Sequence, residues 1–201
     1  GDRGKLFLRY GAMKSGKSTA MLQVAHTYEE REQSVVLMKS SVDTKGDNQI
    51  VSRLGVTRRA DLLLSSGQDL RVALQKLLGE RDDLQRGVAC VLIDEAQFLT
   101  SEQVDQALAI AVLDDIPVVA FGIRTDFRTR AFPGSQRLME VAHSLQEMKT
   151  ICRCGKKAIF NARLGDKGII REGEQVMIDD EHVRYEALCA RCYLEAEQPD
   201  S

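Results

Sequence analysis

The clearest indication of the fold lies near the amino terminus, where residues 5–31 read KLFLRYGAMKSGKSTAMLQVAHTYEER. The apolar run at residues 5–10 predicts a β-strand, and the apolar side chains within residues 17–31 predict an α-helix. The turn between them, GAMKSGKS at residues 11–18, matches the pattern G-x-x-x-x-G-K-[ST] at every position. A strand, a glycine-rich turn and a helix in this order predict a phosphate-binding loop, or P-loop.

The residue types in this turn suit a triphosphate. Glycines allow backbone N–H groups to turn inward around the phosphates, and the following helix directs the positive end of its dipole at them. We expect Lys17 to lie beside the β- and γ-phosphates and Ser18 to hold Mg²⁺. The alternative interpretation is a glycine-rich turn that contains Lys-Ser by chance.

Strands and helices alternate as far as about residue 151, which predicts a mostly parallel sheet with helices on both faces. Residues 1–150 are therefore expected to form an α/β domain of the P-loop NTPase type. The polar stretch at residues 40–56 shows no sustained periodicity and is interpreted as a mobile loop. The remaining expected strands are 34–40, 60–66, 88–94, 117–122 and 146–151. Helices are expected at 68–85 and 101–115, and residues 132–144 are expected to hold a short helix.

A second motif, DEAQ, begins at Asp94, where a buried strand is expected to end. In P-loop proteins an Asp at such a position helps to hold Mg²⁺, so Asp94 joins Ser18 as a candidate magnesium ligand. Glu95 is a candidate general base, which would activate water in an ATPase or take a proton from an acceptor hydroxyl in a kinase. The alternative interpretation is a strand that ends in solvated charges.

Four of the five cysteines lie near the carboxyl end, in the pairs Cys152-x-Cys154 and Cys189-x-x-Cys192. Two closely spaced pairs of thiolates suit tetrahedral Zn²⁺ and leave no open position for a reacting water, so the metal would be structural. The alternative is a set of buried free cysteines. We expect residues 151–201, which are rich in turn residues, to form a small domain of β-hairpins tied by this metal.

Composition narrows the range of partners and locations. A net charge of −2 argues against a protein that holds nucleic acid mainly by neutralising phosphates. No apolar run is long enough to span a membrane, and the first residues do not resemble a signal peptide. We therefore expect a cytoplasmic protein with neither nucleic acid nor membrane as a partner.

The motifs and their order resemble those of the type II thymidine kinases. The stretches that carry the resemblance are GAMKSGKST, LIDEAQFL, FGIRTDFRTRAFPGS, RYEALCARCY and the cysteine pairs, which together cover nearly the whole chain. The resemblance implies a RecA-like α/β domain joined to a zinc-bound domain whose lasso loop closes over a nucleoside. It further implies transfer of the γ-phosphoryl group of ATP to the 5′-hydroxyl of thymidine or deoxyuridine, giving dTMP for nucleotide salvage. A homotetramer and feedback inhibition by dTTP are also implied.

The resemblance assigns roles to individual residues. Glu95 matches the general base and is, with Lys17, the catalytic pair. Phe98 and Phe132 remain open between substrate walls and plain core. The implied ATP- and phosphate-binding residues are Gly11, Ala12, Met13, Lys14, Ser15, Gly16, Lys17, Ser18, Asp94, Glu95, Ala96 and Gln97. The implied nucleoside-binding residues are Met13, Phe98, Phe127, Phe132, Asn161, Arg163, Val176, Ile178 and Tyr185.

Two positions depart from the pattern of the family. Many relatives have Gly-Gly where this chain has Asp179-Asp180, which affects the turn of the lasso. Asp43 is followed by Lys45, where an arginine is common in the family. The lysine ammonium group cannot form the two parallel hydrogen bonds that an arginine guanidinium forms with phosphate, so we expect a weaker phosphate contact. Arg124 and Arg128 remain open between surface charges and phosphate contacts.

Two other functions fit parts of the sequence. The first is a P-loop ATPase switch whose cysteine-rich segment binds nucleic acid or a protein, because DEAQ also resembles the acidic box of helicases. A helicase motor usually needs two such lobes, however, and this chain is long enough for one. The second is a kinase for a different nucleoside, such as deoxycytidine.

Overall fold

The structure is a computed structural model that describes residues 4–40, 49–51, 55–173 and 182–196. Its main element is a six-stranded sheet in the order β5-β2-β6-β7-β1-β8, in which every neighbouring pair is parallel. This confirms the α/β class with a mostly parallel sheet. The strands are β1 (Leu6–Gly11), β2 (Val35–Ser40), β5 (Leu62–Leu64), β6 (Cys90–Asp94), β7 (Val118–Ile123) and β8 (Ser144–Glu147).

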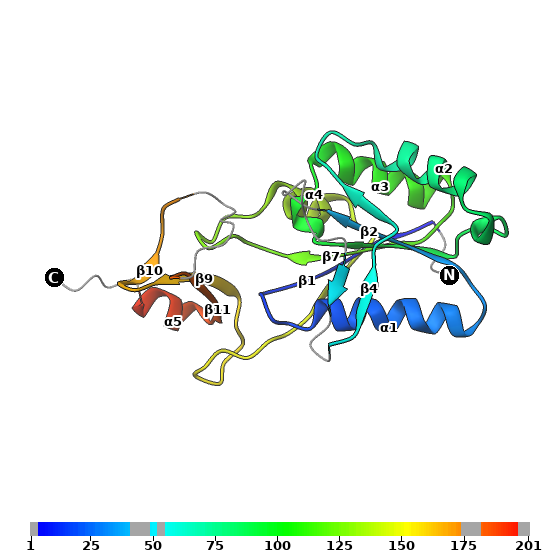
Figure 1. Ribbon diagram of the computed structural model, residues 1–201. Helices are drawn as coiled ribbons and strands as arrows, with labels where there is room; N and C mark the ends of the chain where they lie inside the picture. The colour runs from blue at the N-terminus through cyan, green and yellow to red at the C-terminus, as the bar shows by residue number, and fades with distance from the viewer. Residues whose placement is uncertain (1–3, 41–48, 52–54, 174–181, 197–201) are drawn as a thin grey trace.

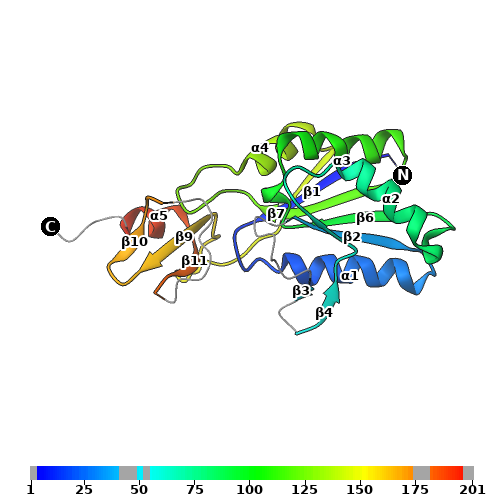
Figure 2. The same ribbon diagram turned by 45° about the horizontal axis from the view of Figure 1, so that its top comes forward.

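Helices cover both faces of this sheet. Helix α1 (Lys17–Glu30) lies on one face, and α2 (Leu70–Glu80), α3 (Ser101–Leu113) and α4 (Pro133–Val141) lie on the other (Figures 1 and 2). The central strands are rich in Val, Leu and Ile and are buried along their length, as expected for a sheet covered on both sides. Two hydrophobic clusters result, one between the sheet and each helical layer.

A second, antiparallel sheet forms from the residues near the carboxyl end. It consists of β9 (Phe160–Gly165), β10 (Gly168–Ile170) and β11 (Arg184–Leu188) in the order β10-β9-β11, and the short helix α5 (Ala190–Glu195) follows it. We call these strands the small sheet. It has its own buried cluster, which includes Tyr193 and two of the cysteines. The division into domains at residue 150 stays a prediction.

The boundaries of several elements differ from the sequence predictions. Residues 49–51 were expected in a loop but form β3 (Gln49–Val51), which pairs antiparallel with β4 (Thr57–Arg59); residues 41–48 and 52–54 of that loop lie outside the described residues. Helix α2 ends before the predicted residue 85, and a 3₁₀ turn (Asp82–Leu84) follows it.

Residues 132–144 hold a short helix, as predicted, but the strand predicted at residues 146–151 was misplaced. Helix α4 ends at Val141, and β8 begins three residues later. The cause is a long-range contact, since the backbone N–H of His143 donates to the carbonyl oxygen of Leu6 in β1 at 2.8 Å. Pairing with β1 therefore begins the strand earlier than the local sequence suggests. Within the described ranges, no helix combines the length and the apolar character needed to cross a membrane.

Helix α4 begins in close contact with the chain that follows β6. A Cβ atom on Gly134 would lie 2.6 Å from the carbonyl oxygens of Ala96 and Leu99 and 2.9 Å from that of Gln97. Only glycine allows this approach without movement of the backbone. The helix thereby fixes the short 3₁₀ turn Ala96–Phe98, which follows Glu95.

We predict that Gly134→Ala lowers the free energy of unfolding by about 1–3 kcal/mol, because the new methyl group forces the two backbones apart. Gly79→Ala is the matched control, since Gly79 lies in helix α2 with open space around its Cα. That change should leave stability unchanged or raise it by up to about 1 kcal/mol. Urea unfolding measures both, and a Gly134→Ala protein as stable as Gly79→Ala would contradict the steric account.

Candidate active site

The P-loop occupies the turn between β1 and α1. Lys14 and Gly16 both have positive φ angles, of 64° and 82°, so the backbone curls and its N–H groups turn toward one side. Gly11 is required for a different reason, because a Cβ there would lie 2.5 Å from the carbonyl oxygen of Met148. Gly16 caps helix α1 without a side-chain hydrogen bond. The first N–H groups of the helix can therefore bind an anion.

Lys17 folds back over this turn. Its Nζ donates to the carbonyl oxygen of Ala12 and to Oγ of Ser15, both at 2.8 Å. The ammonium group is therefore held above the curled backbone. A phosphate group bound there would meet a positive charge in addition to the N–H groups.

The acidic pair lies at the end of β6, which is separated from β1 by β7. Asp94 is only 6% exposed. Burial, and next the neighbouring charge of Glu95, raise the pKa of Asp94 to about 6, while Lys39 and Lys17 act in the opposite direction. A cation beside Asp94 would favour its ionised form.

Glu95 leaves the strand in a left-handed conformation, with φ 55° and ψ 40°. Its carboxylate is held by Gln97, whose Nε2 donates to Glu95 Oε2 at 2.6 Å. The other side-chain atom of Gln97, Oε1, accepts from the backbone N–H of Ile123 at 3.3 Å. Gln97 is 3% exposed and so forms a buried link between β7 and the Glu95 carboxylate.

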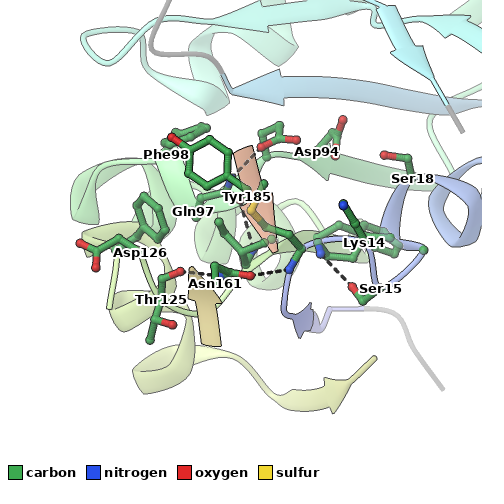
Figure 3. A pocket seen from close by; sticks show the side chains of 18 of the residues that line it. Lys14, Ser15, Ser18, Asp94, Gln97, Phe98, Thr125, Asp126, Asn161 and Tyr185 are labelled. Carbon is green, nitrogen blue, oxygen red and sulfur yellow. Dashed lines mark hydrogen bonds between the residues drawn. The ribbon is translucent and has the colours of Figure 1, made fainter. Parts of the chain in front are cut away.

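The P-loop and the acidic pair line one cavity of about 380 Å³ (Figure 3). Four aromatic side chains also line it, those of Phe98, Phe127, Phe132 and Tyr185, and we call them the aromatic wall. Phe98 and Phe132 pack edge to face, with ring centroids 5.6 Å apart. Both of these residues line the cavity. The predicted site residues that line it are Met13, Lys14, Ser15, Gly16, Lys17, Ser18, Asp94, Glu95, Gln97, Phe98, Phe127, Phe132, Asn161 and Tyr185.

Other predicted site residues lie elsewhere. Gly11, Ala12, Ala96 and Arg163 are described but do not line the cavity. Val176 and Ile178 lie outside the described residues, as do Asp43, Lys45, Asp179 and Asp180. Their roles stay predictions.

Arg163 is fully buried behind the aromatic wall. Its guanidinium carbon lies 3.6 Å from the centroid of the Phe127 ring, and its Nε donates to the hydroxyl oxygen of Tyr185 at 2.9 Å. These contacts hold both rings from the side away from the cavity. Arg163 thus supports the wall from behind.

The sequence predictions missed the part of the cavity that is formed by the end of β7 and by the residues just before Phe127. Thr125 and Asp126 line the cavity just beyond the end of β7. A general rule could have found these residues, because ligand sites in parallel sheets form at the carboxyl ends of the strands. Strand β7 lies between β1 and β6, so its carboxyl end belongs to the same site. The missed lining residues are Thr19, Phe121, Gly122, Ile123, Thr125 and Asp126.

The two arginines left open by the sequence, Arg124 and Arg128, do not line the described cavity. The side chain of Arg128 lies with Nη2 3.5 Å from Oδ2 of Asp126. The same carboxylate accepts hydrogen bonds from the backbone N–H groups of Arg128 and Arg130. Asp126 therefore orders the loop in which Arg128 lies.

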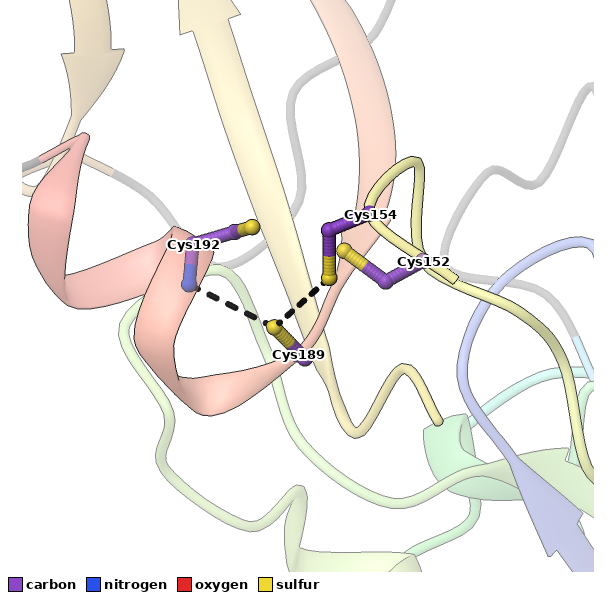
Figure 4. Close-up of side chains that lie close together, drawn as sticks. All are labelled: Cys152, Cys154, Cys189 and Cys192. Carbon is purple, nitrogen blue, oxygen red and sulfur yellow. Dashed lines mark hydrogen bonds between the residues drawn. The ribbon is translucent and has the colours of Figure 1, made fainter. Parts of the chain in front are cut away.

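The four cysteines near the carboxyl end come together beside the small sheet (Figure 4). Their sulfur atoms all lie within 4.8 Å of one another, and those of Cys154 and Cys189 are 3.6 Å apart. Thiolates around tetrahedral Zn²⁺, with Zn–S distances near 2.3 Å, would have sulfurs about 3.8 Å apart. The cluster therefore fits a metal ion bound by four thiolates.

Comparison with known proteins agrees with this arrangement. Residues 4–193 match the family described as thymidine kinase. The chain is 45% identical to the thymidine kinase of Idiomarina loihiensis over 95% of its own length and 96% of that protein. It is 44% identical to the thymidine kinase of Chromobacterium violaceum, over 94% and 97% of the two chains, and 39% identical to that of Enterobacteria phage T4, over 94% and 95%. This protein therefore belongs to the thymidine kinase family.

Proposed function

We propose that this protein transfers the γ-phosphoryl group of ATP to the 5′-hydroxyl of thymidine, and also of deoxyuridine. The observation that carries the proposal is that a P-loop, a carboxylate pair and an aromatic wall share one cavity. The names of the relatives support thymidine as the acceptor. A flat pyrimidine base would lie against the aromatic wall, with its sugar directed at the acidic pair.

The P-loop would hold the donor. Its curled backbone and Lys17 would bind the β- and γ-phosphates, and Ser18 and Asp94 would hold Mg²⁺. When bound, Mg²⁺ neutralises part of the negative charge on the phosphates. Lys17 already lies over the turn, so it can stabilise the charge that develops on the departing ADP oxygen.

Glu95 would act as the general base. As the 5′-oxygen bonds to the γ-phosphorus, the bond from that phosphorus to the bridging oxygen of ADP breaks, and the hydroxyl proton passes to Glu95. The hydrogen bond from Gln97 keeps the carboxylate in one orientation. In this proposal the two carboxylates have separate roles, since Asp94 would face the metal and Glu95 would face the acceptor.

The remaining features implied by the family resemblance belong to the same proposal. Val176 and Ile178 would offer backbone groups to the edge of the base. dTTP would inhibit, because its base can occupy the nucleoside pocket while its phosphates reach the P-loop. A homotetramer and a cytoplasmic location complete the proposal, and Zn²⁺ is the metal that we assign to the four cysteines.

The transfer of label from γ-labelled ATP to a panel of nucleosides tests the function. Label in thymidine and deoxyuridine is expected. Label only in deoxycytidine would assign a different nucleoside. ATP hydrolysis stimulated by nucleic acid, without a labelled nucleoside, would favour the ATPase switch instead.

We predict that Glu95→Gln lowers kcat by about 10²–10⁴-fold, because the amide cannot accept the hydroxyl proton. The affinities for ATP and thymidine should be retained. Glu102→Gln, at an exposed position in the first turn of α3, is the control and should leave kcat unchanged. Steady-state kinetics with isothermal titration separate the two effects, and full turnover by Glu95→Gln would refute its role as the base.

Asp94 gives a prediction about pH. Because its pKa is raised to about 6 in the fold, the folded protein holds a proton between pH 4 and 6 that the unfolded chain releases. Stability is therefore lost as the pH rises through 6. Asp94→Asn removes this loss, so the nucleotide-free variant should be more stable than the wild type by about 2–3 kcal/mol at pH 8.

Urea unfolding from pH 4 to pH 8 measures the difference between the two proteins, which should shrink toward pH 4. A difference that does not change with pH would contradict the assignment. The variant should also lose magnesium-dependent transfer, since the neutral amide is a poor ligand for Mg²⁺.

The cysteine cluster gives a prediction about metal content. Cys192→Ser should abolish equimolar zinc binding, lower the melting temperature and raise the KM for thymidine, because the metal would no longer stabilise the small sheet. Cys90→Ala is the control, since Cys90 lies in β6 within the core and should not affect zinc. Metal analysis and thermal unfolding are the measurements. A small sheet that stays folded after complete chelation would show that the metal is not structural.

A further inference from the structure

One buried side chain joins the small sheet to the P-loop. Asn161, in β9, is 2% exposed. Its Oδ1 accepts a hydrogen bond from the backbone N–H of Met13 at 2.6 Å, and its Nδ2 donates to the carbonyl oxygen of Thr125 at 2.9 Å (Figure 3). Met13 lies in the turn after β1 and Thr125 lies just beyond β7, so the amide bridges the ends of two adjacent strands.

The bond to Met13 bears directly on the phosphate-binding turn. The N–H of Met13, within the P-loop, donates to Oδ1 of Asn161, so Asn161 fixes the backbone of the turn at that residue. A turn made of curled backbone and glycines has many alternative conformations, and a buried partner removes most of them. Another contact of this kind, from Thr150 Oγ1 to the carbonyl oxygen of Lys14, is 3.4 Å long and exposed. Asn161 is therefore the stronger constraint of the two.

The position of Asn161 is set in turn by the strands around the cysteine cluster. Asn161 lies opposite Ala187 in β11, and Cys189 follows two residues later. On its other side, the backbone N–H of Ile159 donates to the carbonyl oxygen of Leu188 at 2.9 Å. The segment that carries Asn161 is thus paired with the chain that leads into the second cysteine pair.

We propose that Asn161 is a positioning residue that fixes the P-loop from the small sheet, so that the affinity for nucleotide depends on its hydrogen bond to the backbone of Met13. This role differs from the contact with the nucleoside that the resemblance assigns to Asn161. It rests on the proposed function only in that the P-loop binds Mg²⁺–ADP and Mg²⁺–ATP, and it does not require thymidine to be the acceptor.

Asn161→Leu tests the proposal, because leucine has nearly the shape of asparagine but forms neither hydrogen bond. We expect its affinity for Mg²⁺–ADP, measured by isothermal titration without nucleoside, to fall by about tenfold. A purely structural role would lower the melting temperature and leave this affinity unchanged. Affinity equal to that of the wild type in a folded variant would overturn the proposal.

Tyr193→Phe is the matched control. The buried Tyr193 hydroxyl donates to the carbonyl oxygen of Phe127 at 2.7 Å, so it also joins the carboxyl-terminal elements to the loop after β7, but it does not reach the P-loop. This variant should have a lower melting temperature and an unchanged affinity for Mg²⁺–ADP. An equal loss of affinity in both variants would show that general loosening, and not the bond to Met13, controls the P-loop.

Hydrogen exchange in the wild-type protein provides a measurement that does not depend on the folding of a variant. The amide hydrogen of Met13 should exchange slowly without nucleotide, because it is hydrogen-bonded to Oδ1 of the buried Asn161. Exchange at the rate of an unstructured peptide would overturn the proposal. None of these measurements uses an acceptor, so a failure to phosphorylate thymidine would refute the proposed function without affecting them.

Discussion

The parallel pairing of β1, β7 and β6 is the constraint from which the site follows. Ala120 in β7 lies opposite Leu8 in β1 and Ile93 in β6, so the three strands end at nearly the same level. The P-loop, the segment after β7 and the acidic pair therefore meet at one edge of the sheet. A slip of one residue would move the side chains of a strand from one hydrophobic cluster to the other, and the close packing of both clusters opposes this.

The same edge concentrates features that are unfavourable for stability. Asp94 is a buried carboxyl with a raised pKa, and Glu95 adopts a left-handed backbone conformation that is uncommon outside glycine. The structure around them compensates through the hydrogen bonds of Gln97 and the close packing at Gly134. Local strain of this kind is typical of sites that must hold charged groups in fixed positions.

Much of this arrangement could be predicted from sequence because its signals are local. The P-loop, the DEAQ motif and the cysteine pairs are short patterns whose chemistry depends on neighbouring residues. The contacts of Asn161 and the early start of β8 were not predictable, since both depend on hydrogen bonds between segments far apart in the chain. Periodicity located the helices and the strands of the main sheet, but it missed β3 and could not locate ends that are set by pairing with the sheet.

The burial of Arg163 behind the aromatic wall has a consequence for how such a pocket can evolve. One guanidinium group contacts both Phe127 and Tyr185, so the two rings and the cation form a single packed unit. Replacing one ring by a smaller side chain would strip part of the cover from a buried charge, which is costly. A lineage adapting to a bulkier base would therefore have to exchange all three side chains together, or make room on another side of the pocket.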